Sequence, residues 1–275
     1  MNSHPSILER SLYRLLAPRH ALPQFLILGA QRSGTTRLYK WMMKHPQILP
    51  GTEKEIHFFD RNFQNGVPWY QLHFPARKRM GDNRITGEAT PYYLFHPRAP
   101  ERIRHVLPDV KMIALLRNPV ERAVSHYFRE AHMGEEDRPI GEALRLEESR
   151  LKPELEKMQN DEFYFSEIHH RKSYKTRGIY VEQLKRYFDL FERRQLLVLT
   201  SEEFFSDPEN ALHVIFSFLE VNAGFVPPRI VAQNLSGRAP GVPESVYEYL
   251  QKYFEPHNEA LFQLLGRNLG WNARK

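Results

Sequence analysis

Residues 25–36, FLILGAQRSGTT, decide the fold of this chain. The apolar run at 25–28 predicts a buried parallel strand, and residues 29–36 predict a tight turn that leads into a helix. Gly29 and Gly34 have the G-x-x-x-x-G spacing of a phosphate-binding loop, in which backbone N–H groups and a helix N-terminus hold an anion. The stretch therefore predicts an α/β protein with an anion site at the end of a strand.

The cation of this loop stands in an unusual position. In enzymes that use nucleoside triphosphates, the second glycine is followed by Lys, which reaches the outer phosphates, and by Ser or Thr, which holds Mg²⁺. Here Thr35 and Thr36 follow Gly34, and Arg32 lies inside the loop beside Ser33. This arrangement favours a ligand with one 5′-phosphate and a short anionic group beyond it over the tail of Mg·ATP.

The composition is that of a soluble globular protein, with 41% hydrophobic and 26% charged residues among 275. The formal net charge of +6 favours an anionic ligand, but it does not distinguish a nucleotide, a polysaccharide, a membrane surface or a nucleic acid. The chain contains no cysteine, which excludes disulfides, thiolate metal sites and cysteine nucleophiles.

Residues 1–23 predict an N-terminal helical extension, and residues 24–275 predict a single domain. The extension carries leucines at the spacing of a short amphipathic helix, namely Leu8, Leu12, Leu15 and Leu16. It lacks the apolar core of a signal peptide, and no segment approaches eighteen consecutive apolar residues. We therefore expect a soluble, cytoplasmic protein with no membrane span and no nucleic-acid partner, and its oligomeric state is open.

Apolar runs at 25–28, 112–116 and 196–199, with a weaker one at 84–88, predict strands. Each run is followed by turn residues and then by helical periodicity, the alternation expected of a mostly parallel sheet flanked by helices. Together with the loop at 29–36, this pattern predicts one α/β domain with a phosphate-loop architecture like that of P-loop NTPases.

Two regions outside this alternation predict helices. Residues 135–177 are charge-dense and poor in strand formers, so we expect helices over the edge of the sheet that could help to form a substrate cleft, although their role is open. Residues 243–265 predict two structural helices broken at Pro256. The adjacent His169 and His170 are expected at the surface rather than as metal ligands, and no cluster at ligand spacing indicates a metal.

A second candidate anion site follows the predicted strand at 112–116. Arg117 stands just past its carboxyl end, where open α/β sheets bind ligands. Ser125 lies on the helix that follows, and a guanidinium with a hydroxyl suits a terminal phosphate. On the same helix, Arg122 and Arg129 are expected to lie on a solvated basic face.

Two titratable residues in the segment 54–60, KEIHFFD, are candidate general bases. Glu55 and His57 are two positions apart and lie on the same side if the backbone is extended. Either could accept a proton, whereas Arg32 could supply only positive charge, because its pKa stays above about 12.

Taken together, these motifs resemble those of the sulfotransferases that use 3′-phosphoadenosine 5′-phosphosulfate (PAPS). The loop GAQRSGTT is similar to the family's 5′-phosphosulfate loop, and LLRNPVERAVSHY is similar to its 3′-phosphate motif, with Arg117 and Ser125 at the matching positions. A free 3′-phosphate distinguishes this nucleotide from ATP, so the two motifs together are more specific than either alone. The similarity covers most of the chain from Gln24 onward, and residues 135–177 match least.

The nearest branch of that family modifies glycans. KEIHFFD resembles the segment of heparan sulfate N- and 3-O-sulfotransferases whose Glu is the catalytic base, so the resemblance assigns that role to Glu55 and a positioning role to His57. GEATPYY resembles E-K-T-P-x-Y, a segment that faces the sugar chain, with Ala89 where a substrate-contacting Lys is common. Gly237 and Arg238 match a loop that closes over the nucleotide.

The resemblance implies an enzyme that moves a sulfuryl group from PAPS to a hydroxyl or amine, on a saccharide, by in-line transfer, with PAP as product and no metal. It implies Glu55 as base, assisted by His57, and Arg32 as the group that stabilises the leaving phosphate. The implied nucleotide-binding residues are Gln31, Arg32, Ser33, Gly34, Thr35, Thr36, Arg117, Ser125, Gly237 and Arg238. The implied acceptor-binding residues are Lys54, Glu88, Thr90 and Tyr92.

Two other classes of protein stay open at this point. The missing Lys after Gly34 argues against a phosphate-loop kinase or NTPase. The presence of both Glu55 and an intact phosphate loop argues against a non-catalytic binder of anionic glycans or nucleic acid. The sequence does not identify the acceptor, and it does not decide between O- and N-sulfation.

Overall fold

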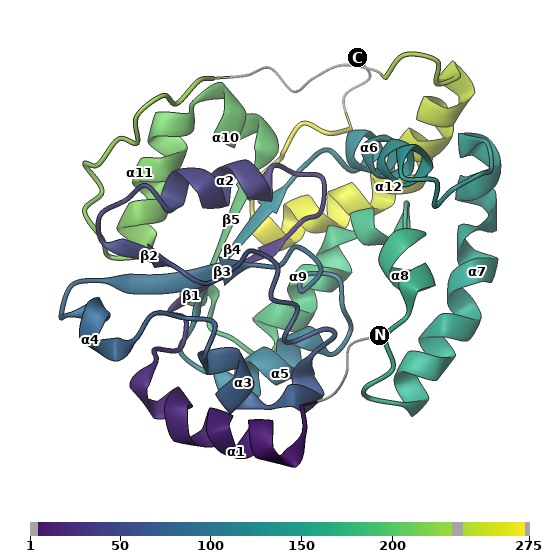
Figure 1. Cartoon of the computed structure of the whole chain (residues 1–275). Coiled ribbons are helices and arrows are strands. Elements are labelled where there is room, and N and C mark those ends of the chain that lie inside the picture. The colour runs from purple at the N-terminus through teal and green to yellow at the C-terminus, as the bar shows by residue number, and fades with distance from the viewer. Residues whose placement is uncertain (1–4, 233–238, 273–275) are drawn as a thin grey trace.

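Within residues 5–232 and 239–272, the part of the chain that the computed structural model describes, five parallel strands form one central sheet (Figure 1). In chain order the strands are β1 (Phe25–Gly29), β2 (Ile48–Pro50), β3 (Ile85–Ala89), β4 (Lys111–Leu116) and β5 (Leu196–Thr200). Their order across the sheet is β2-β3-β1-β4-β5. The predicted α/β class with a parallel sheet is confirmed, and the loop after β1 lies at the centre of the sheet's carboxyl edge.

The four predicted strands are confirmed, but β2 was not predicted. It is only three residues long, lies at the edge of the sheet and ends in Pro50. So short a segment has no apolar run to reveal it, and proline is tolerated because an edge strand has ladder partners on one side only.

Helices cover both faces of the sheet (Figure 1). The helices on one face are α2 (Thr35–Met42), α10 (Ser201–Ser206) and α11 (Pro208–Phe218). Those on the other are α5 (Ala99–Val106), α6 (Pro119–His132), α9 (Tyr180–Phe188) and α12 (Glu244–Leu265). Successive side chains of β1 alternate between the two cores: Phe25 and Ile27 pack in the first, and Leu26 and Leu28 in the second. A central parallel strand has no solvent face, which explains the unbroken apolar run.

The remaining helices lie outside these two layers. The predicted helical segment contains α7 (Ile140–Asn160) and α8 (Glu167–Arg171), which form an outer layer at the side of the molecule (Figure 1). At another end, α1 (Ile7–Leu16) packs on α3 (Val67–Gln71), and α4 (Arg77–Met80) lies nearby. Short 3₁₀ turns occur at Ala17–Arg19, Phe63–Asn65, Thr176–Gly178 and Arg193–Gln195. None of the described helices is both long and apolar enough to cross a membrane.

The predicted break at Pro256 is wrong, because α12 is one continuous helix. Pro256 lies on its exposed side, whereas Phe254 and Asn258 are buried on the inward side. The carbonyl left free by the missing N–H therefore faces water, and packing of the flanking turns holds the helix together. Pro153 is exposed within α7 in the same way.

Two predictions of surface position are also wrong. Arg122 is fully buried, and it donates a hydrogen bond to the backbone oxygen of Tyr174, whereas Arg129 is partly exposed. His169 is buried as well, with its Nδ1 2.5 Å from the hydroxyl oxygen of Tyr92. In both cases the covering residue comes from a distant part of the chain, which a helical pattern alone does not reveal.

Candidate active site

The phosphate loop between β1 and α2 has glycines where a side chain would not fit. Gly34 has a φ of +93°, and a Cβ atom there would lie 2.6 Å from the ring of Phe205 in α10. A Cβ atom at Gly29 would lie 2.8 Å from the backbone oxygen of Pro91. The two glycines therefore let the loop pack directly against α10 and against the segment after β3, which gives the predicted G-x-x-x-x-G spacing a physical reason.

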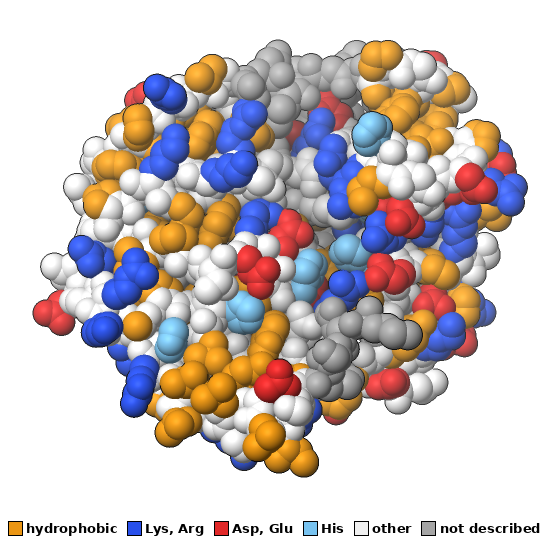
Figure 2. All heavy atoms as spheres, viewed as in Figure 1, with side chains coloured by type: hydrophobic (Ala, Val, Ile, Leu, Met, Phe, Trp, Pro, Cys, Tyr) orange, Lys and Arg blue, Asp and Glu red, His pale blue; other side chains and the backbone are white. Residues whose placement is uncertain are grey.

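A groove of about 630 Å³ opens beside this loop, and five of its eleven described lining residues are basic. These basic residues are Arg32, Arg37, Lys40, Lys44 and Arg117. The rest of the lining consists of Gly34, Thr35, Thr36, Trp41, Ser125 and Phe205, so none of the described lining residues is acidic. Figure 2 shows Lys and Arg side chains gathered on the surface over α2. The groove is suited to a ligand with several negative charges.

The two predicted anion motifs meet in this groove. Arg32 Nε donates to Ser125 Oγ at 3.0 Å, although the two residues are 93 positions apart. Arg117 donates from Nη1 to the backbone oxygen of Arg32 at 3.2 Å, and its Nη2 lies 3.2 Å from Glu121 Oε2. Partial desolvation, followed by the charges of Arg129 and Arg117, lowers the pKa of Arg32. A bound anion would relieve this repulsion between cations.

Some polar atoms of the phosphate loop and of Arg117 have no partner within the described protein. The buried hydroxyl of Ser33 and the buried Nε of Arg117 are both without a hydrogen bond. Leaving such groups unsatisfied is unfavourable, so they indicate a place where a ligand completes the structure. Gln31 instead turns toward Arg177, from which its side-chain oxygen accepts a hydrogen bond. Gly237 and Arg238 lie outside the described residues.

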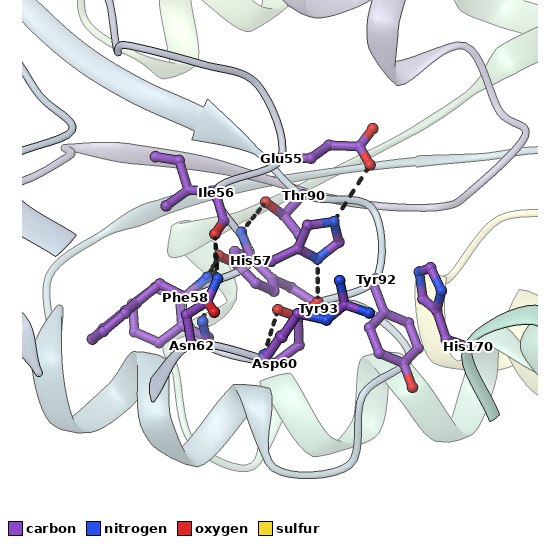
Figure 3. A network of polar contacts seen from close by, with 12 residues as sticks. Glu55, Ile56, His57, Phe58, Asp60, Asn62, Thr90, Tyr92, Tyr93 and His170 are labelled. Atoms are coloured by element: carbon purple, nitrogen blue, oxygen red, sulfur yellow. Dashed lines mark hydrogen bonds and ion pairs between the residues drawn. The ribbon is translucent and has the colours of Figure 1, made fainter. Parts of the chain in front are cut away.

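Glu55, His57 and Asp60 form a line of three titratable side chains (Figure 3). The line is linked to the phosphate loop through His170 and Arg177: the rings of His57 and His170 are 6.0 Å apart, and Arg177 donates hydrogen bonds to His170 and to Gln31. His57 lies between two carboxylates, with Nδ1 2.7 Å from Asp60 Oδ2 and Nε2 3.7 Å from Glu55 Oε2. Asp60 is fully buried, whereas the side chain of Glu55 is 42% exposed and also pairs with Lys54. Glu55 is therefore the most exposed member of the line, since the side chain of His57 is 20% exposed and that of Asp60 is buried.

The charges along this line depend on one another. Burial alone would lower the pKa of His57, but Asp60 and Glu55 raise it to about 10. Burial alone would raise the pKa of Glu55, but His57 and Lys54 lower it to about 2. At neutral pH Glu55 is therefore a carboxylate beside the imidazolium of His57, and it is in the deprotonated state that a general base requires.

Three residues of the site have a left-handed backbone. Among the described non-glycine residues, φ is positive at Arg32, Glu55, His57, Glu220 and Arg229. The values are 70° at Arg32, 65° at Glu55 and 55° at His57. This conformation costs an L-residue about 1–2 kcal/mol, and such strain gathers at functional sites. Three of these five residues are thus ones that the sequence motifs also indicate, by an independent route.

The segment after β3 supports this line rather than facing solvent. Glu88 is buried and accepts hydrogen bonds from Tyr70 at 2.6 Å, Tyr93 at 3.0 Å and Thr90 at 2.7 Å. Tyr93 in turn accepts a hydrogen bond from the backbone N–H of Phe58 at 2.8 Å. Burial raises the pKa of Glu88.

The acceptor contacts implied for this segment find no open surface. Glu88, Thr90 and Tyr92 are all buried. Thr90 accepts a hydrogen bond from the backbone N–H of His57 and donates one to Glu88, whereas the hydroxyl of Tyr92 pairs with His169. Lys54 is part-exposed and is paired with Glu55, so it alone among the four implied acceptor residues is open to solvent.

Sequence reasoning missed three residues of the site. Asp60 was not singled out, although its i+3 spacing from His57 was the available signal. Arg177 is fully buried, stacks over the ring of Tyr92 at 5.0 Å and donates to the backbone oxygen of His170 at 2.7 Å. The ring of His170 lies 6.0 Å from that of His57. Nothing local in the sequence brings the segment 170–177 to this place. The described residues contain no group of three or more His or acidic side chains that could hold a metal ion.

Comparison with known proteins identifies the class. The family described as "Sulfotransferase domain" matches residues 22–239. This chain therefore belongs to the sulfotransferase family, and its relatives are enzymes. A sulfotransferase of known structure from Alicyclobacillus acidocaldarius is 30% identical, with a TM-score of 0.70, over 92% of this chain and 100% of that one. The predicted family and the predicted phosphate-loop architecture are both confirmed.

Named relatives point to more specific activities of their own. The membrane-associated sulfotransferase kil1 of Dictyostelium discoideum is 28% identical over 91% of this chain. Heparan sulfate glucosamine 3-O-sulfotransferase 6 of Mus musculus is 28% identical over 92% of this chain. The chain spans 66% of the length of the first relative and 75% of the second.

Proposed function

We propose that this enzyme transfers a sulfuryl group from PAPS to a hydroxyl or amine of a saccharide, with Glu55 as the general base. The observation that carries the proposal is that the Glu55–His57–Asp60 line is linked through His170 and Arg177 to Gln31 of the phosphate loop. Beside that loop lies the groove in which the two phosphate motifs meet. The names of several relatives, which specify heparan sulfate glucosamine, support a saccharide acceptor.

The residues of the groove fit PAPS by their chemistry. The phosphate loop offers backbone N–H groups together with Thr35 and Thr36 for the 5′ end. Arg117 and Ser125 would hold the 3′-phosphate. The Nε–H of Arg117, which has no partner within the described protein, could donate a hydrogen bond to it. When bound, PAPS supplies an activated sulfuryl group with a phosphate as leaving group. Arg32 would stabilise the charge that develops on that phosphate.

Proton transfer falls to Glu55. As the acceptor oxygen or nitrogen forms its bond to sulfur, the bond from sulfur to the phosphate oxygen breaks and its electron pair leaves with the phosphate. The acceptor's proton passes to a carboxylate oxygen of Glu55. While it is paired with Lys54 and His57, Glu55 is a weak base, because both partners favour its ionised form. An acceptor that displaces Lys54 would make Glu55 more basic at the moment when it is needed.

Ala89 bears on how highly sulfated the acceptor saccharide has to be. Ala89 ends β3 at the position where the glycan branch commonly has a substrate-contacting Lys, and here it is fully buried. With no cation at this position, we propose a saccharide that does not need to be highly sulfated. A cytoplasmic location and independence of metal ions also remain predictions.

A transfer assay tests the proposal. The protein is incubated with labelled PAPS and a panel of oligosaccharides, glycolipids, small alcohols and amines, with EDTA in a parallel series, and products are detected by their mass shift. We expect transfer to at least one saccharide, unchanged by EDTA and absent in the Glu55→Gln variant. Transfer to small alcohols alone would remove the saccharide assignment, and equal transfer by the variant would remove the mechanism.

A further inference from the structure

The helix α1 carries an apolar face that no other part of the described chain covers. Its side chains Ile7, Leu8, Leu12 and Leu15 are 84%, 83%, 50% and 68% exposed, and no residue of α1 is buried. Leu8, Leu12 and Leu15 follow one another at i, i+4 and i+7, so they form a single stripe along the helix. A contiguous apolar patch of this kind is rare on a soluble protein unless it binds something.

Exposed basic side chains lie on the other faces of α1 and on α4. Arg10 and Arg14 are exposed on α1 itself, and Arg77, Lys78 and Arg79 are exposed on α4. Arg77 Nε donates at 3.1 Å to the backbone oxygen of Pro18, which places α4 beside the end of the extension. Figure 2 shows hydrophobic side chains gathered over α1 and α3, with Lys and Arg side chains alongside.

We infer that this face, formed by the α1 stripe and the basic residues of α1 and α4, binds the surface of an anionic lipid bilayer. An amphipathic helix with leucines on one face and arginines on another can enter the boundary between headgroups and acyl chains, and nearby cations attract anionic headgroups. A second copy of this chain fits less well, because a two-fold interface would place the same cations opposite one another.

Docking at this face would also orient the active site. α1 packs on α3, and His73, two residues past the end of α3, lies 3.0 Å from Thr52 Oγ1 and 3.3 Å from Glu53 Oε1. The loop that carries Glu55 is thus joined directly to the layer beneath α1. A bilayer bound here would lie next to the Glu55 side of the site rather than next to α2, which is on the other face of the sheet.

Co-sedimentation with vesicles tests the inference independently of any enzymatic activity. The full chain is mixed with vesicles of phosphatidylcholine, with and without phosphatidylglycerol. We expect binding to the anionic vesicles only, and weaker binding as salt is added. The triple variant Leu8→Ser, Leu12→Ser, Leu15→Ser is expected to bind at least about tenfold more weakly, because each leucine loses its apolar burial in the bilayer.

A second variant and a control sharpen the test. Replacing Arg77, Lys78 and Arg79 by Gln should weaken binding by roughly fivefold per charge, since a basic residue near an anionic surface contributes about that factor. The control, Val226→Ser with Val231→Ser, alters two valines that are 53% and 62% exposed elsewhere, and should bind like the wild type. The leucine and valine variants should keep the wild-type melting temperature, because none of these side chains is buried. The basic-residue variant should stay close to it, because the hydrogen bond from Arg77 to Pro18 that it removes is exposed.

Two results would overturn the inference. Wild-type protein that stays in the supernatant with anionic vesicles, or a leucine variant that sediments as well as wild type, would show that the face does not bind lipid. A dimer detected by light scattering that the leucine variant abolishes would instead assign the face to a second copy of the chain.

Discussion

On the nucleotide side of the site, which is the groove around Arg32 and Arg117, buried polar atoms have no partner within the described protein. On the acceptor side, which is the 54–60 loop, Glu55 already holds Lys54 and His57. Binding on the first side can therefore add contacts to a structure that lacks them. Binding on the second side has to exchange one set of contacts for another.

This difference predicts which residues should affect nucleotide binding and which should affect turnover. A ligand that completes unsatisfied groups is held tightly, so residues of the nucleotide side should affect affinity and stability. Groups that act when charge moves should instead affect turnover: Glu55 on the acceptor side, and Arg32 beside the leaving phosphate on the nucleotide side. The predictions below test that division, in descending order of expected effect.

The largest effect is expected for Glu55→Gln. The amide keeps the size of the side chain but cannot accept the proton, so we expect kcat to fall by about 10²–10⁴-fold. The affinity for PAP, measured by calorimetry, should stay almost unchanged, because Glu55 does not line the groove. The matched control is Glu53→Gln, a carboxylate two residues away that contacts His73 instead and should leave kcat near the wild-type value. A parallel loss of PAP affinity in Glu55→Gln would place Glu55 on the nucleotide side.

Arg32→Ala should produce the next largest effect on turnover. Removing one charge that stabilises a transition state typically costs about 2.7–4 kcal/mol, which is roughly 10²–10³-fold in kcat. Arg32→Lys should retain substantial activity, because the cation is kept. Lys40→Ala removes a charge from the same groove but not from the loop, and it should cost much less. Equal losses in Arg32→Ala and Lys40→Ala would mean that only the overall charge of the groove matters.

The nucleotide side should distinguish its ligands by the 3′-phosphate. PAP at about 100 times its Kd should stabilise the fold by about 2.7 kcal/mol, and AMP at the same concentration by much less. Thermal unfolding with each nucleotide measures the difference. Ser125→Ala should reduce the increase in melting temperature that PAP causes and should not change the increase that AMP causes. Equal increases with PAP and AMP in the wild type would contradict the 3′-phosphate site.

The smallest effect is expected for His57→Asn, and it should appear in the pH dependence. Glu55 loses the imidazolium that favours its ionised form, so its pKa should rise from about 2, and the acid limb of kcat/KM should move to higher pH. An acid limb that stays in place would show that His57 does not control the charge of Glu55. If His57→Asn abolishes activity while Glu55→Gln keeps most of it, then His57 is the general base and Glu55 is the positioning residue.

The same variant should change stability in a defined pH window. The pKa of His57 in the folded protein is raised from 6.5 to about 10, so the stabilisation that it contributes is complete below pH 6.5 and is lost as the pH rises toward 10. The melting temperature of His57→Asn should therefore fall furthest below that of the wild type at pH values under 6.5. Near pH 10 the two proteins should approach each other.

The nucleotide side could be predicted because the residues that determine each of its two motifs are close together in the sequence. A strand, two glycines at fixed spacing and a helix start determine the loop, and Arg117 and Ser125 lie on a single strand–helix unit in the same way. The fold class follows from the same alternation of apolar runs and helical periodicity. These patterns depend on backbone geometry, which neighbouring residues set.

What could not be predicted depends on contacts between distant segments. Arg122 reads as a surface residue on its own helix and becomes buried only because Tyr174 covers it. Arg177 reaches the site by stacking on Tyr92, 85 positions earlier in the chain. Helix α12 continues through Pro256 because its two flanking turns are buried in the core. In each case tertiary packing overrides the local preference that the sequence displays.

The left-handed backbone at Arg32, Glu55 and His57 has a consequence for protein engineering. Glycine accepts such a φ freely, and Arg32 is also repelled by Arg129 and Arg117, so a search for heat-resistant variants that ignores activity should enrich glycine at position 32. At Glu55 and His57 the loss of their ion pairs opposes the same gain. A screen that couples survival to sulfation would keep the Arg32 charge on which transfer depends.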